Sequence, residues 1–383
     1  MKPFIVHQLY RSTFAPLLRP VRTLCAVLVA LFSQADVSAA PRSAIPFEKL
    51  FGENGFADES NYLKPPTKVL GGFEIQEIRD VAPASGSFKA RMYVWLFWDE
   101  PKANPVLPEG RNSLAFDASS VFERGLVWNP DPSFSNALEP PLVDERTVEV
   151  WPESLEYWFR AAGTFTDRAG ALDFRWFPFD SQKLRIELET PYSTKLVNLV
   201  GDPEVDPEVL RNQVKALRNA EWEFTDAHIE ESTVSYFSEE DGTLSQLSIV
   251  IDAKRRSGFY LVHIYLPIFI ILSLCYFALW LPEKWSEAIV GTFVTCLLSL
   301  IAFNFIVSED IPKVGYLTVM HVSIAVAYLF ILISYFSHMV YLRSPENVRR
   351  RRMYSVVRSF LGFVIAGGVV WIIGLFAVTQ FYI

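Results

Sequence analysis

Seven residues at helical spacing, in a stretch around residue 300, have side chains that suit the passage of ions. They are Glu287, Gly291, Thr295, Leu298, Ala302, Phe305 and Glu309. Steps of four or three residues place all of them on one face of a helix. Because polar and ionisable groups at membrane depth face protein or water, this face is a candidate pore lining. A packing face is the alternative, since small residues also let membrane helices approach closely. Composition alone favours neither.

The chain contains few residues that could carry out catalysis. Only His228, of five histidines, lies in the polar part of the sequence, and Cys25, Cys275 and Cys296 all lie in apolar segments. A His/Cys metal site, a Ser-His-Asp set and a disulfide framework are therefore not expected in the polar part. We predict that the protein is not an enzyme and that it has no metal site and no cofactor.

Four apolar stretches in the last third of the chain are long enough to cross a bilayer as helices. We predict spans at about residues 258–281, 287–307, 315–342 and 354–383. The linker 343–353 holds Arg343 and the run 349–352, and short basic loops stay on the cytoplasmic side. The preceding domain and the C-terminus would then lie outside. Anchoring of these arginines to membrane lipid is compatible with the same topology.

The polar part, from about residue 68 to 252, consists of short alternating segments rich in Val, Ile, Tyr, Phe and Trp. This pattern predicts an all-β sandwich or barrel rather than a parallel sheet. The predicted strands cover residues 72–79, 89–98, 146–151, 155–166, 181–188 and 246–252.

Export and charge set the context of this domain. Residues 1–39 have the pattern of a signal peptide, with Arg19 and Arg22 before an apolar run, although an uncut signal anchor is an alternative.

Residues 40–257 hold 37 acidic and 23 basic residues, a net charge of −14. Such a domain argues against nucleic acid as a partner and attracts cations. A solvated acidic surface explains the charge equally well.

Several motifs, in a fixed order along residues 68–383, resemble those of the pentameric ligand-gated ion channel (Cys-loop receptor) family. They are Phe177-Pro178-Phe179-Asp180-Ser181-Gln182, Val127-Trp128-Asn129-Pro130-Asp131 with Asn136, Arg255 before Phe259-Tyr260-Leu261 and Pro267, Ile301-Ala302-Phe303-Asn304, and Ile311-Pro312-Lys313 with Tyr316. Gly170 and Leu184 stand where animal members have the loop cysteines, as in the bacterial branch that lacks this disulfide.

This resemblance implies an immunoglobulin-like extracellular sandwich (40–257), a four-helix membrane domain (258–383) and a homopentamer around a central pore in a bacterial cytoplasmic membrane. It implies that the second span lines the pore, with Glu287 at the cytoplasmic mouth and Glu309 at the outer mouth. Leu298, Ala302 and Phe305 would form an apolar gate. Carboxylate rings attract cations, so we predict permeant monovalent cations. Ion pairs with Lys284 and Lys313 would weaken that prediction.

The resemblance also implies two further sites. The ligand site would lie between subunits and involve aromatic residues, namely Tyr93, Trp128, Tyr192, Tyr236 and Phe237. Aromatic rings bind ammonium groups, although Trp and Tyr in a sandwich also serve as core. The gating interface would comprise Phe177, Pro178, Phe179, Asp180, Arg255, Pro312, Lys313 and Tyr316, with Asp180 and Arg255 as a buried ion pair.

Two questions stay open at the level of sequence. The opening signal is either a small ligand such as an amine or protons that act on the carboxylates of the acidic domain. The second question is conduction itself, because a membrane-anchored oligomeric sensor or binding protein would share the same overall organisation. The polar face between residues 287 and 309 favours the channel, since an anchor needs no hydroxyls or acidic ends.

Overall fold

The computed structural model describes most of the chain after residue 66. The described residues are 67–82, 85–100, 112–123, 127–166, 172–236, 242–308, 313–343 and 347–381, and the side chains are described as far as Gly368. The predicted signal peptide, residues 1–39, lies outside the described residues.

The N-terminal domain is a sandwich of two sheets, which confirms the prediction of an all-β sandwich. The larger sheet has the order β3-β5-β6-β2-β1-β8, with strands Leu114–Asp117, Leu142–Trp151, Ser154–Thr166, Ser87–Asp99, Thr67–Ala82 and Val197–Gly201. The smaller sheet has the order β4-β7-β10-β9, with strands Ser133–Phe134, Ser181–Ser193, Thr243–Arg255 and Trp222–Ser235. Neighbouring strands are antiparallel, except that β1 pairs with β8 in parallel.

Strict alternation of side chains builds the core between the sheets. In β7, Leu184, Ile186 and Leu188 are fully buried, and Ile186 pairs with Ile249 of β10. The opposite face of β7 carries Glu187 and Glu189. Because the side-chain period is two, the apolar set fixes which face these carboxylates occupy.

The described residues of this domain also include two short helices, and neither is predicted from the sequence. The helix α3 spans Ala118–Phe122 and α4 spans Pro207–Ala216. Each begins after an aspartate, Asp117 or Asp206, whose side chain accepts a hydrogen bond from a backbone N–H of the first turn. The helix α4 also has an apolar side, since Leu210 and Val214 are buried at i, i+4 spacing, so both its cap and its pattern mark it.

The C-terminal domain is a bundle of helices. Its elements are α5 (Gly258–Tyr260), the π-helical turn η4 (Leu261–Tyr265), α6 (Leu266–Ala278), the 3₁₀ turn η5 (Glu283–Trp285), α7 (Ser286–Val307), α8 (Val319–Leu342) and α9 (Val348–Phe381). Among the described residues, three segments are long and apolar enough to cross a membrane, namely Gly258–Ala278, Glu283–Val307 and Val319–Leu342. The fourth predicted span, 354–383, lies largely in α9 and stays a prediction.

Two helix boundaries differ from the prediction. The helix α8 begins at Val319 rather than near residue 315, because the side chain of Thr318 caps it together with that of His321. The helix α9 begins at Val348, so the arginine run 349–352 is helical instead of forming a linker. Arginine is a good helix former, and the side chain of Asn347 accepts a hydrogen bond from the backbone N–H of Arg349.

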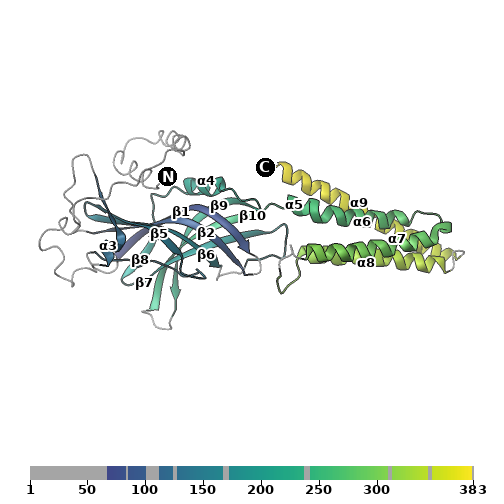
Figure 1. Ribbon diagram of the computed structural model, residues 1–383, viewed down its shortest axis with the longest axis horizontal. Helices are drawn as coiled ribbons and strands as arrows, with labels where there is room; N and C mark the ends of the chain where they lie inside the picture. Colours follow the sequence, from purple (N-terminus) through teal and green to yellow (C-terminus); the bar gives the residue numbers. More distant parts are fainter. Residues whose placement is uncertain are drawn as a thin grey trace.

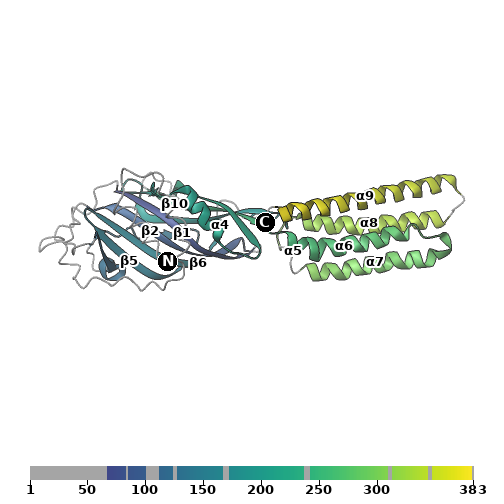
Figure 2. The same cartoon turned by 90° about the horizontal axis from the view of Figure 1, so that it is seen from above.

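The molecule is elongated, with the sandwich and the bundle end to end (Figure 1). The helices α6, α7, α8 and α9 run side by side along the long axis (Figure 2). The C-terminal end of α9 lies close to the sandwich, at the end of the bundle where α5 begins. The seam between the two domains is formed by the loop before β7, the end of β10 and the loop before α8.

Candidate functional site

The predicted pore face of α7 is uncovered within one chain. Glu287, Gly291, Thr295, Leu298, Ala302 and Phe305 are all exposed, and Leu298 and Phe305 are 60% and 72% exposed. The buried residues of α7 are Ile289, Phe293, Cys296, Leu300 and Val307. They lie on the opposite side of the helix and pack it into its own bundle. The predicted face is therefore free to contact water or another subunit.

Glu287 has no ion-pair partner among the described residues. In particular, no bond joins it to Lys284, so the pairing that would weaken its field is not formed. Further along the face, the hydroxyl of Thr295 donates to the carbonyl oxygen of Gly291 at 2.9 Å. That bond holds the hydroxyl against the helix and leaves its oxygen as an acceptor. Glu309 lies outside the described residues.

The buried Arg255 lies at the seam between the two domains. The Nε of Arg255 lies 2.7 Å from Oδ1 of Asp180, and both side chains are 1% exposed. A second carboxylate, that of Glu221, also contacts the guanidinium. The guanidinium lies 4.1 Å from the ring of Trp222 and 4.9 Å from that of Phe177. The structure thus brings Phe177, Asp180 and Arg255 together.

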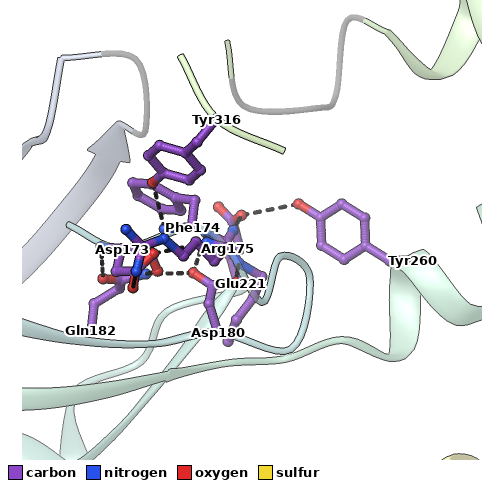
Figure 3. A network of polar contacts seen from close by, with 9 residues as sticks. Asp173, Phe174, Arg175, Asp180, Gln182, Glu221, Tyr260 and Tyr316 are labelled. Atoms are coloured by element: carbon purple, nitrogen blue, oxygen red, sulfur yellow. Dashed lines mark hydrogen bonds and ion pairs between the residues drawn. The ribbon is translucent and has the colours of Figure 1, made fainter. Parts of the chain in front are cut away.

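The same cluster reaches the helices. The hydroxyl of Tyr260, in α5, donates to Glu221 at 3.1 Å (Figure 3). The ring of Phe177 meets that of Tyr260 at 5.0 Å, and the ring of Phe179 lies 5.9 Å from that of Tyr265. A change in the position of the loop before β7 would therefore be felt directly at the start of the first membrane segment.

A second connection joins the loop before β7 to the loop before α8. The backbone N–H of Phe174 donates to the hydroxyl of Tyr316 at 2.8 Å (Figure 3). The backbone N–H of Val319 donates to the carbonyl oxygen of Arg175, also at 2.8 Å. Of the other predicted interface residues, Pro178 lies in the same loop, Lys313 is exposed, and Pro312 lies outside the described residues.

The candidate ligand site contains an acid that the sequence prediction missed. The hydroxyl of Tyr236 lies 2.9 and 2.8 Å from the two carboxylate oxygens of Glu189. The side-chain amide of Gln246 donates to Glu189 at 2.6 Å. Glu189 is 5% exposed, and no cationic side chain of the described residues pairs with it. Tyr236 is 47% exposed, so this acid lies just beneath an accessible ring. Phe237 lies outside the described residues.

Trp128 and Tyr192 form a separate pair behind this acid. Their ring centroids are 5.4 Å apart, and the hydroxyl of Tyr192 donates to the carbonyl oxygen of Asn129 at 3.0 Å. Trp128 is 8% exposed and meets Trp98 edge-on at 5.6 Å. Trp128 therefore belongs to the core, while Tyr192 is only partly buried and fixes the loop that leads into β4.

Tyr93 lies on the other sheet, far from Tyr236 in the topology. It is 5% exposed on the outward face of β2, and its hydroxyl donates to Glu145 at 3.0 Å. The guanidinium of Arg160 lies 5.8 Å from its ring centroid and pairs with Asp144 at 2.6 Å. A single chain therefore does not bring Tyr93 together with Tyr192 and Tyr236.

Sequence reasoning missed Glu189, Gln246 and Glu221. Glu189 could have been found, because Glu187 lies in the predicted strand 181–188 and Glu189, one residue past its predicted end, continues the same face. Glu221 carries no such signal. It joins the Arg255 cluster because the next residue, Trp222, pairs in register with Arg255 at the end of β10.

Known proteins resemble this chain in both of its domains, although no family model matches it. The chain is 28% identical over 278 residues to a proton-gated ion channel of Gloeobacter violaceus, over 70% of this chain and 71% of that protein. It is 21% identical over 306 residues to the glycine receptor subunit beta of rat and of human, over 76% of this chain and 59% of the receptor subunit. These relatives are ion channels rather than enzymes. The order of motifs, the sandwich joined to apolar helices and these relatives agree, and the chain resembles the pentameric ligand-gated ion channel family.

Proposed function

We propose that the chain is the subunit of a homopentameric, cation-selective channel that opens in response to an extracellular signal. The observation that carries this proposal is the face of α7 from Glu287 to Phe305, which is exposed along its length and carries an unpaired carboxylate at one end. A helix that served only to pack would bury such a face within its own bundle.

Five copies of this face would form successive rings around a pore. A ring of Glu287 carboxylates attracts cations and repels anions, and the Thr295 oxygens replace part of an ion's hydration shell. Leu298, Ala302 and Phe305 would form the narrow apolar part, which can close by losing its water. Glu309 would add a second acidic ring at the outer mouth.

The membrane orientation follows from the arginines at the start of α9. Basic segments next to a membrane helix stay in the cytoplasm, so the sandwich and the end of α9 would face the exterior or periplasm of a bacterium. The closeness of the end of α9 to the sandwich supports this orientation (Figure 2).

An amine is the first candidate for the opening signal. Glu189 is a buried carboxylate with neutral partners only, and the hydroxyl of the exposed Tyr236 donates to it. An ammonium group there would neutralise the carboxylate and contact the face of the ring. Tyr93 from the neighbouring subunit would complete the site, because it lies on the outward face of the other sheet.

Protons are the second candidate, and a different residue favours them. Burial raises the pKa of Glu74, on β1, to about 7. Glu74 pairs in register with Tyr93 of β2, next to the Glu145 and Arg160 side chains. This carboxyl therefore changes its charge near neutral pH, on the face that would meet the neighbouring subunit.

Reversal potentials test the pore. In planar bilayers with a salt gradient, we expect the purified protein to select for cations. Glu287→Gln should weaken and Glu287→Lys should reverse that preference, because the ring supplies the field. Glu283→Gln is the matched control, since Glu283 lies one turn earlier but is bonded to Tyr341. Equal reversal potentials for wild type and both Glu287 variants would show that α7 does not set selectivity.

Activation by an amine panel tests the ligand site. Glu189→Gln should raise the half-maximal concentration of an activating amine about tenfold or more, because the loss of a charged partner costs about 1.5–3 kcal/mol. Glu223→Gln, on the exposed face of β9, should leave it unchanged. If a folded, oligomeric protein conducts under none of these signals, the sensor without conduction becomes the better proposal.

A further inference from the structure

A cavity of about 740 Å³ lies in the sandwich between α3, β5, β6 and the segment 129–141 that contains β4. Its floor is aromatic: the ring of Tyr157 lies 5.0 Å from that of Phe122 and 5.1 Å from that of Phe159. Cavities that bind small molecules measure roughly 300–1,000 Å³. This one is separate from Glu189 and Tyr236, which do not line it.

The floor contains a tyrosine hydroxyl that has no hydrogen-bond partner among the described residues. Tyr157 is 7% exposed, and no described residue forms a hydrogen bond with its hydroxyl. Burial raises the pKa of Tyr157 to about 12, so the group keeps its proton at neutral pH and can donate. Buried tyrosine hydroxyls usually find a partner, because an unsatisfied polar group is costly. This hydroxyl is available to a molecule in the cavity.

Charges of both signs line the cavity. They are Glu123, Asp131, Glu139 and Arg146, and none of their side chains is bonded to another described residue. Elsewhere on the same sheet the opposite holds, since Arg160 pairs with both Asp144 and Glu145. The backbone N–H of Asp131 donates to the side-chain oxygen of Asn129, which fixes the turn that brings Asp131 to the cavity.

We propose that this cavity binds a zwitterionic small molecule with an aromatic side chain, the chemistry of an aromatic amino acid. Its ring would lie on Phe122, Tyr157 and Phe159. Its carboxylate would pair with Arg146, and its ammonium group with Asp131. The hydroxyl of Tyr157 would donate to the same carboxylate. The hydroxyl of Tyr157 and the side chains of Asp131 and Arg146 would then each have a partner.

The cavity shares one segment with the face that carries Glu189. Asp131 and Phe134 line the cavity, while the hydroxyl of Ser135 donates to Glu187 at 3.1 Å on β7. The carbonyl oxygen of Asn129 accepts the hydroxyl of Tyr192. A molecule in the cavity therefore restrains the segment that supports the candidate agonist site, and it should change agonist sensitivity. Only this regulatory consequence rests on the proposed function.

Binding to the full-length protein in detergent, measured by calorimetry, tests the cavity without any current. The probe is L-phenylalanine, compared with phenethylamine, 3-phenylpropionate and glycine, which lack the carboxylate, the ammonium group and the ring. We expect L-phenylalanine to bind at least about tenfold more tightly than each of the others, because each loses a charged contact or the ring contact.

Three substitutions locate the binding. Tyr157→Phe, Arg146→Gln and Asp131→Asn should each weaken L-phenylalanine binding about tenfold. Asparagine tolerates the positive φ of residue 131, so that variant keeps its backbone. The matched control Arg91→Gln, an exposed arginine on β2, should bind as wild type. Absence of L-phenylalanine binding, or loss of binding in Glu189→Gln but not in Tyr157→Phe, would overturn the proposal.

Discussion

Arg255 is a fully buried charge that is balanced on two sides. Asp180 and Glu221 provide opposite charge, and the rings of Trp222, Phe177 and Phe174 provide their π-faces, the last at 5.9 Å. Breaking such a cluster by removing one member leaves an uncompensated charge in a dry environment. The cluster therefore holds the end of β10 and the loop before β7 in one arrangement.

Asp180→Asn should lower the stability of the sandwich by about 3–5 kcal/mol, and by less if Glu221 compensates part of the lost charge. The measurement is thermal unfolding of the detergent-solubilised protein. The control is Asp80→Asn, which breaks the exposed pair with Lys89 and should leave the melting temperature unchanged. Equal melting temperatures for wild type and Asp180→Asn would show that Asp180 is not needed to balance Arg255.

Motif order predicted the pairing of Asp180 with Arg255, because both positions belong to segments that meet at the seam in the family. It did not predict Glu189, whose role arises from Tyr236 and Gln246 on other strands. Side-chain identity at a strand position indicates which face it occupies. It does not indicate which residues of the adjacent strand will lie beside it, because they depend on the register between the strands, which was not predicted.

At the scale of elements, the helices α6 and α9 approach closely at one glycine. A Cβ on Gly362 would lie 2.4 Å from the hydroxyl oxygen of Tyr276, a distance that real contacts do not reach. Small residues allow such approaches between membrane helices. The contact sets how tightly α9, which carries the arginine run, is held against the rest of the bundle.

Gly362→Ala should destabilise the bundle by about 1–3 kcal/mol, since overpacking forces the two helices apart. Gly367→Ala, one turn and a half further along α9, is the control, because nothing lies within 4 Å of its added Cβ. The double variant Gly362→Ala with Tyr276→Phe should recover most of the loss. Thermal unfolding in detergent measures all three, and an unimpaired single variant would contradict the packing argument.

The sequence predicted six strands and the starts of two membrane segments well, because long periodic or apolar runs have few alternatives. It missed β9, where Asp226, Glu230 and Glu231 interrupt the alternation on an exposed sheet edge. It also placed the start of α9 too late, because arginines were assigned to a linker. A run of charged residues indicates contact with solvent or with lipid headgroups, but it does not exclude a helical conformation.

At the scale of the whole molecule, we expect the stability of the acidic sandwich to depend on pH through Glu74. The pKa of Glu74 is raised by burial to about 7, above its unfolded value of about 4.3. The folded state therefore holds this proton more tightly than the unfolded state. Its contribution to stability is complete below pH 4.3 and is lost as the pH rises through 7.

We expect the melting temperature of the wild type to fall between pH 5 and pH 8, by an amount equivalent to about 1–3 kcal/mol. Glu74→Gln should remove that slope, and Glu77→Gln, on the same strand, should keep it. If protons open the channel, Glu74→Gln should also shift the pH of half-maximal current. An unchanged melting slope in Glu74→Gln would refute the raised pKa.

The hydrogen bonds of Phe174 and Val319 at the seam bear on whether the two domains can be exchanged between related proteins. One bond joins two backbone groups, and the other requires only a backbone N–H and the hydroxyl of Tyr316. Any residue except proline supplies such an N–H. This joint therefore does not depend on the side chains at positions 174, 175 and 319. We therefore expect a chimera spliced after Arg255 to dock its two halves through this joint when the incoming bundle keeps tyrosines at positions 260 and 316, because Tyr260 also contacts Glu221 and Phe177 of the sandwich.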